Sequence, residues 1–150
     1  MSSEPRVLIV EDNDVLRAML FTILRHQPIG VDTAATGDEA FRKVMQCDYA
    51  LIIVDTDMPH DACDRFVRRF REERPEATTF VLAVRDPKNE RYLSADLFSA
   101  IVNKPLEIDM LAEVVRETAH VVPLPDDPLP CPPSENDIRS KLERGPYLAN

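Results

Sequence analysis

The first 119 residues alternate between short apolar runs and longer segments whose apolar residues recur at helical spacing. The runs are predicted to be strands and cover residues 7–10, 51–54, 80–84 and 100–102, with 31–35 as a weaker candidate. Apolarity along the first four runs is continuous and does not alternate, which indicates strands that are covered on both faces. This pattern is typical of a parallel sheet between two layers of helices.

The segments between these runs carry the stripes of amphipathic helices. The clearest stripe extends from Val15 to Leu24, after the cap candidates Asn13 and Asp14, and Pro28 ends it. Further helices are predicted around residues 38–45, 66–70, 88–97 and 108–115. The order βαβαβαβαβα predicts right-handed crossovers and a doubly wound, five-stranded parallel sheet in a three-layer α/β/α sandwich. In such a fold, functional groups gather at the carboxyl ends of the strands.

The composition changes after Ala119. Six prolines fall between Pro123 and Pro133, so residues 120–133 are predicted to be an extended linker, with a docking role as a proline-rich ligand as the alternative. In residues 134–150, a capping box of Ser134 and Asp137 predicts a short helix that ends before residue 145. Two apolar residues are too few for this tail to form a core, so one domain is expected over residues 1–119.

The formal net charge of −9 argues against a nucleic-acid surface, because phosphate binding needs clustered Lys and Arg. No apolar run is long enough to span a bilayer, and the first residues lack the apolar core of a signal peptide. We therefore expect a cytoplasmic protein with no membrane contact. The three cysteines are scattered and odd in number, which argues against a disulfide framework or a zinc site. Cys47 and Cys63 are expected to be buried hydrophobic residues, and Cys131 to be exposed among prolines.

Three predicted strands end in charged residues with no evident structural role. Glu11 and Asp12 follow the first strand, Asp55 the third and Lys104 the fifth. The carboxylates should converge at one edge of the sheet, where their mutual repulsion calls for a cation, and hard oxygen ligands suit Mg²⁺ or Mn²⁺. Lys104 is placed to pair with Asp55 or with a phosphoryl oxygen. The set favours phosphoryl transfer with Asp55 as the nucleophile, although an acid pair after a strand also serves as a helix cap.

Three blocks of this sequence resemble the signature blocks of bacterial response-regulator receiver domains, the CheY-like family with a flavodoxin-like fold. They are Val-Leu-Ile-Val-Glu-Asp-Asn at 7–13, Ile-Ile-Val-Asp-Thr-Asp-Met-Pro at 52–59 and Asn-Lys-Pro at 103–105. The resemblance implies a phosphoacceptor at Asp55, metal ligation by Glu11, Asp12 and Asp55, and a backbone-carbonyl ligand at Asp57. It implies a signalling domain, not an enzyme with turnover, whose phosphodonor is a sensor histidine kinase, a phosphotransfer protein or a small acyl phosphate.

The sequence departs from the family pattern at its switch positions. The alignment puts Ala83 at the end of the fourth strand, where the family has Thr or Ser, and Ile101 where it has Tyr or Phe. We expect phosphorylation of Asp55 to signal weakly or by another route. Arg85 and His60 are candidates for modulating the lifetime of the phosphoryl group, and each is also explained as a solvated side chain.

Two other functions compete with a receiver that is switched by phosphorylation of Asp55. One is a degenerate receiver that binds proteins without phosphorylation, for which the altered switch residues argue. The other is a phosphohydrolase with Asp55 and Asp57 as an Asp-x-Asp pair, against which stand the two strand–helix units that precede the motif. A downstream protein partner is expected, and a homodimer is predicted through the face of the fourth helix, fifth strand and fifth helix.

Overall fold

The computed structural model describes residues 4–89 and 93–144. Its five strands form one parallel sheet in the order β2-β1-β3-β4-β5, which confirms the predicted doubly wound α/β fold. The strands are β1 (Arg6–Val10), β2 (Gly30–Ala34), β3 (Leu51–Asp55), β4 (Phe80–Arg85) and β5 (Ala100–Asn103). All of their carboxyl ends therefore lie at one edge of the sheet.

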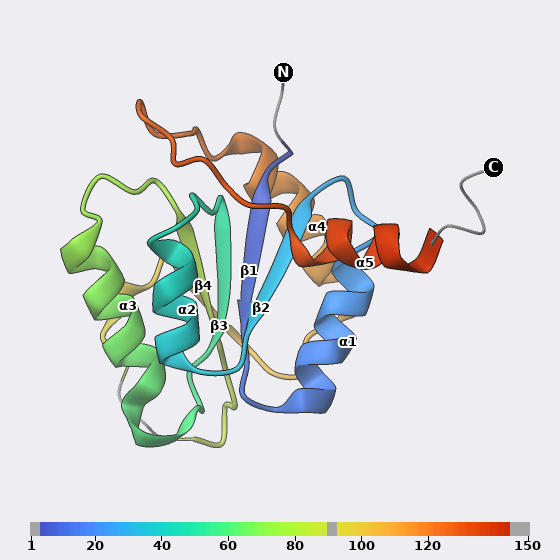
Figure 1. Ribbon diagram of the computed structural model, residues 1–150. Helices are drawn as coiled ribbons and strands as arrows, with labels where there is room; N and C mark the ends of the chain where they lie inside the picture. Colours follow the sequence, from blue (N-terminus) through green and yellow to red (C-terminus); the bar gives the residue numbers. More distant parts are fainter. Residues whose placement is uncertain (1–3, 90–92, 145–150) are drawn as a thin grey trace.

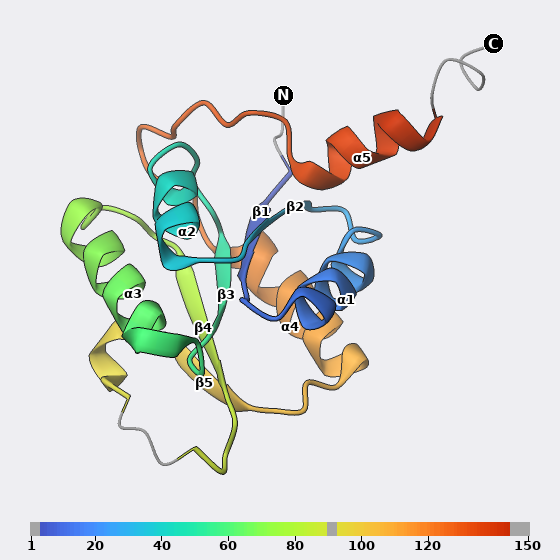
Figure 2. The same ribbon diagram turned by 60° about the horizontal axis from the view of Figure 1, so that its bottom comes forward.

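Helices cover both faces of this sheet (Figures 1 and 2). One layer contains α1 (Asp14–Leu24) and α4 (Ile108–Val121), and the other contains α2 (Gly37–Val44) and α3 (Ala62–Glu73). The two layers bury separate clusters, so that Leu8 of β1 packs in one and Ile9 in the other. Two-sided burial is the reason why the central strands read as continuous apolar runs.

The helix predicted over residues 88–97 is wrong for the part of it that the structure describes. Residues 90–92 lie outside the described ranges, and the remainder holds only the 3-10 turn η2 (Ala95–Leu97). Before the gap, the chain makes a turn in which Asp86 accepts hydrogen bonds from the backbone N–H groups of Lys88 (2.9 Å) and Asn89 (2.9 Å). Local hydrogen bonds of an aspartate compete with helix formation, and at Asp86 the chain forms a turn.

The C-terminal segment folds back onto the domain. Residues 122–133 form neither helix nor strand and pass along the amino-terminal edge of the sheet to α5 (Glu135–Arg144), which lies beside β2 (Figure 1). Asn136 accepts from the N–H of Val31 (2.9 Å) and donates to the carbonyl of Ile29 (2.9 Å), while Glu135 accepts from the N–H of Thr33 (2.8 Å). These side chains occupy the hydrogen-bonding groups of an edge strand that would otherwise be open.

A disulfide bond joins Cys47, which follows α2, to Cys131 in the proline-rich segment. The expectation that the cysteines form no disulfide is therefore wrong. Cys131 is exposed and Cys47 is buried, as predicted, but the folded tail brings their Cα atoms to 4.7 Å across 84 residues of sequence. Within the described ranges, no helix has the length and apolarity needed to cross a bilayer.

Candidate functional site

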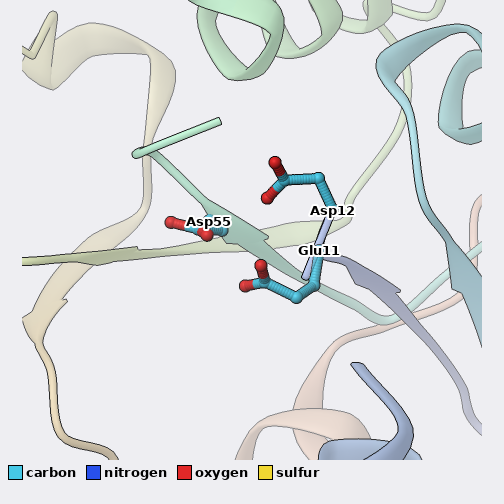
Figure 3. Close-up of side chains that lie close together, drawn as sticks. All are labelled: Glu11, Asp12 and Asp55. Carbon is cyan, nitrogen blue, oxygen red and sulfur yellow. The ribbon is translucent and has the colours of Figure 1, made fainter. Parts of the chain in front are cut away.

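Three carboxylates meet where β1 and β3 end. Val10 and Val54 are cross-strand partners, so Glu11 and Asp12 lie next to Asp55, the last residue of β3. One carboxylate oxygen from each of the three side chains lies within 4.8 Å of the others, and Figure 3 shows them around one space. Glu11 and Asp55 are buried, whereas Asp12 is exposed. The predicted convergence of these three acids is present.

The cluster carries more negative charge than its surroundings neutralise. Burial, followed by the hydrogen bond with Asp55, raises the pKa of Glu11 from 4.5 to about 8, although the N–H of Asn13 acts in the opposite direction. A carboxyl group with this pKa holds a proton near neutral pH unless a cation replaces it. Hard oxygen donors around one space are the ligands that Mg²⁺ prefers, so the residues fit such an ion.

Lys104 supplies the positive charge next to this cluster. Its Nζ lies 3.1 Å from Oδ1 of Asp55 and 3.2 Å from Oδ2 of Asp57. Burial by itself lowers the pKa of Lys104, but the hydrogen bonds and charges of Asp55 and then Asp57 raise it above the ordinary value. The ammonium group stays charged and is shared between two carboxylates.

Asp57 has a second role that the sequence did not indicate. Its carboxylate accepts hydrogen bonds from the N–H of Asp86 (2.8 Å) and from the side-chain amide of Asn89 (2.8 Å) in the loop after β4. Burial raises the pKa of Asp57, but these two bonds and Lys104 lower it below the ordinary value. The backbone-carbonyl role implied for Asp57 stays a prediction. No spacing along the chain pairs residue 57 with 86 or 89, so only the folded loop reveals the contact.

The predicted switch positions lie one and two strands away from β3, on β4 and β5. Ala83 pairs with Val54 on one side and Ile101 on the other, and it is fully buried. The strand continues to Arg85, one residue beyond the apolar run predicted at 80–84, and the role of Ala83 as a switch position stays a prediction. The end of β4 was predicted from its apolar run, and Arg85 at the end of the strand does not continue that run. Arg85 donates to the side-chain oxygen of Asn103 (3.2 Å), and Ile101 is 39% exposed.

His60 lies in the loop after β3, in an unusual backbone conformation. Its φ is 58° and that of Asp61 is 55°, both in the left-handed region, which costs a residue with a side chain about 1–2 kcal/mol. Both side chains are exposed. This geometry explains why glycine would suit position 60, and it keeps a strained turn beside the acidic cluster.

The arrangement can support chemistry on a phosphoryl group. A carboxylate at a rigid strand tip serves as a nucleophile, acids beside it can hold a divalent cation, and a lysine can neutralise charge on transferred oxygens. Asp55 is the candidate nucleophile because it is the acid that contacts both the cluster and Lys104.

Comparison with known proteins agrees with this geometry. The model of the response regulator receiver domain family matches residues 7–116. The transcriptional regulatory protein PmrA of Pectobacterium parmentieri is 29% identical over 112 residues, which cover 74% of this chain and 50% of PmrA. The chain thus spans about half the length of this relative.

Solved structures show the same fold. The response regulator TrrA of Thermotoga maritima, in complex with Mg²⁺ and BeF, is 27% identical with a TM-score of 0.65, over 76% of this chain and 98% of TrrA. A CheY-like receiver domain from Methylobacillus flagellatus is 23% identical with a TM-score of 0.67, over 77% of this chain and 99% of that domain. Since the family model covers most of the sequence, this chain belongs to the response regulator receiver domain family of two-component systems.

Proposed function

We propose that this protein accepts a phosphoryl group on Asp55 in a Mg²⁺-dependent reaction. The observation that carries the proposal is the position of the Asp55 carboxylate, 3.1 Å from the ammonium group of Lys104 and within 4.8 Å of the acids Glu11 and Asp12. A nucleophile, a charge-neutralising lysine and a cation-binding pair thus lie around one point. The complex of TrrA with Mg²⁺ and BeF supports the proposal, because beryllium fluoride has the shape and charge of a phosphoryl group.

The roles of the residues follow from their positions. Glu11, Asp12 and Asp55, with the backbone carbonyl of Asp57, would hold Mg²⁺, which supplies positive charge to the phosphoryl oxygens when bound. An oxygen of Asp55 forms the new bond to phosphorus as the bond from phosphorus to the donor's leaving atom breaks. Lys104 neutralises negative charge on the transferred group. The product is an aspartyl phosphate at the sheet edge.

The phosphodonor is proposed to be a sensor histidine kinase, a phosphotransfer protein or a small acyl phosphate, and the output to be a contact with a downstream protein in the cytoplasm. The proposed homodimer face consists of β5 and α4, because the helix predicted before β5 is absent from the described part of the segment. Arg85 and His60 remain the proposed modulators of phosphoryl lifetime.

No observation favours the Asp-x-Asp phosphohydrolase. The Asp57 carboxylate is engaged by Asp86, Asn89 and Lys104, and it does not belong to the group of three acids that meet within 4.8 Å. The convergence of Asp55, the acid pair and Lys104 argues against a degenerate receiver that takes up no phosphoryl group. Labelling of Asp55 decides between that alternative and the proposed phosphoryl acceptor.

The test is intact-mass measurement after incubation with acetyl phosphate and Mg²⁺. The wild type should gain the mass of one phosphoryl group, and Asp55→Asn should gain nothing. Asp96→Asn serves as the matched control because Asp96 is an exposed acid in η2, and it should be labelled like the wild type. Chelation of Mg²⁺ should prevent labelling of every variant. An unlabelled wild type, or labelling of Asp55→Asn at the wild-type level, contradicts the proposal.

A further inference from the structure

The Asp57 carboxylate connects the acceptor site to the loop after β4. On one side it pairs with Lys104 at 3.2 Å, and Lys104 in turn contacts Asp55 at 3.1 Å. On the other side it accepts 2.8 Å hydrogen bonds from Asp86 and Asn89. A continuous path of charge-assisted contacts therefore leads from the nucleophile to a turn outside the acidic cluster.

A phosphoryl group on Asp55 changes the balance of charge along this path. It replaces the single negative charge of the Asp55 carboxylate with a group of up to two negative charges and three strong acceptor oxygens next to Lys104, whose ammonium group now divides its contacts between two single carboxylates. Lysine is a compact charge on a flexible stem, so it can turn toward the stronger anion. Asp57 then loses its cation and faces a like charge nearby, which disfavours its present position.

We infer that the Asp57 side chain is the conformational switch of this receiver: it fastens the Asp86–Asn89 turn in the unphosphorylated state and releases that turn when Lys104 moves to the phosphoryl group. Asp57 is a positioning residue in this role, because it acts through Lys104 and the turn. The inference rests on the proposed function, since it requires a phosphoryl group on Asp55.

This chain has a particular need for such a connection. Neither Ala83 nor Arg85, the last residue of β4, carries a hydroxyl group that could follow the phosphoryl group, and Ile101 has no polar atom to reorient. The Asp86–Asn89 turn begins directly after β4 and is fastened to the site by both of its end residues. Release of the turn changes the surface beside β5 without help from the usual switch positions.

The experiment measures amide hydrogen exchange by NMR, with and without Mg²⁺ and beryllium fluoride. In the wild type, the beryllium fluoride complex should speed exchange of the Asp86 N–H about tenfold or more, as expected for the loss of a charge-assisted hydrogen bond. In Asp57→Ala, the same amide should exchange fast before any addition and should change little afterwards. Asp57→Asn keeps one acceptor oxygen but loses the ion pair with Lys104, so its exchange should be intermediate.

Asp96→Ala is the matched control, because it removes an exposed acid from η2 that does not belong to this path, and it should behave like the wild type. Fluorine NMR reports separately whether beryllium fluoride is bound. A wild type that binds it with no change at Asp86 overturns the inference and leaves the proposed function standing. A wild type that does not bind it and takes up no phosphoryl group contradicts the proposed function itself. A full response at Asp86 in Asp57→Ala also overturns the inference.

Discussion

Two clusters of acidic and basic side chains at different places on the sheet are built for different purposes. The acidic edge consists of Glu11, Asp12, Asp55, Asp57 and Lys104 at the carboxyl ends of the strands. The tail seat consists of Arg6, Asp32, Lys43, Tyr49 and Glu135, where α5 joins β2. Both contain buried carboxylates, but they differ in how far basic side chains balance the negative charge.

In the tail seat, the donors match the acceptors. Asp32 accepts from Arg6 (2.9 Å), from the hydroxyl of Tyr49 (2.7 Å) and from the N–H of Glu135 (2.9 Å), and Glu135 pairs with Lys43 (2.8 Å). At the acidic edge, the pKa of Glu11 is raised to about 8, which indicates charge that the fold leaves uncompensated. A cluster whose charges balance stabilises structure, whereas a cluster with excess negative charge is prepared for a cation, at a cost in stability.

The largest expected effect comes from breaking the tail seat. Asp32→Ala removes the carboxylate acceptor of the buried Tyr49 hydroxyl and of the half-buried Arg6, and should lower the free energy of unfolding by about 3–5 kcal/mol. Urea denaturation measures this change. Glu11→Gln is the matched change at the acidic edge and should stabilise the metal-free protein near pH 8, because it removes an ionising group from the crowded cluster. Equal losses in the two variants would contradict the contrast between the clusters.

The second effect tests the covalent fastening of the tail. Cys131→Ser opens the disulfide bond to Cys47 and should cost about 2–4 kcal/mol, because the unfolded chain regains the freedom of a long closed loop. Thermal unfolding with and without reductant is the measurement. Reductant should destabilise the wild type by a similar amount and leave Cys131→Ser unchanged. The wild type can also be unfolded, fully reduced and refolded in reductant. If its thermal stability were then unchanged, the disulfide bond would not hold the tail.

The third effect concerns pH at the acidic edge. The folded-state pKa of Glu11 is about 8, above its ordinary 4.5, so the folded protein retains a proton that the unfolded chain releases within this window. Stability contributed by this group is therefore greatest below pH 4.5 and falls as the pH rises towards 8. Mg²⁺ must displace the proton, so its affinity should rise by up to about tenfold per pH unit well below pH 8 and should level off as the pH passes this value.

Calorimetric titration of Mg²⁺ at a series of pH values measures this dependence. Glu113→Gln, which changes an exposed glutamate of α4, should preserve the slope, whereas Glu11→Gln should flatten it and weaken binding. A wild-type affinity that is independent of pH across the window would mean that Glu11 does not lie at the metal site.

The smallest effect tests backbone strain, which the described residues show at the acidic edge in His60 and Asp61. His60→Gly should stabilise the protein by about 0.5–1 kcal/mol, because glycine adopts a positive φ without steric cost and this gain exceeds its entropic cost. Chemical denaturation is sufficient to detect the change. Glu117→Gly, in the middle of α4, is the control and should destabilise by about 1 kcal/mol. A destabilised His60→Gly would mean that the loop gains more from the histidine than it loses in strain.

The predictions that succeeded rest on periodic or local signals. Continuous apolar runs identify the central strands, and the acids after β1 and at the end of β3 are brought together by the parallel register alone. Two predictions failed near the end of β4. The Asp86 turn takes the place of the start of a predicted helix, and Arg85 extends β4 beyond its apolar part.

The order of apolar and polar residues along the chain therefore determined the sheet, its two helical layers and the residues at the acidic edge. Side-chain periodicity is a local property, and parallel strands place all of their carboxyl ends at one edge. Only the tertiary structure decided the disulfide bond, the tail seat and the second role of Asp57. Cys47 and Cys131 are separated by 84 residues, and Asp57 lies 29 residues from Asp86. Such contacts depend on how a non-repetitive segment turns in space, and the spacing of residues along the chain does not encode that path.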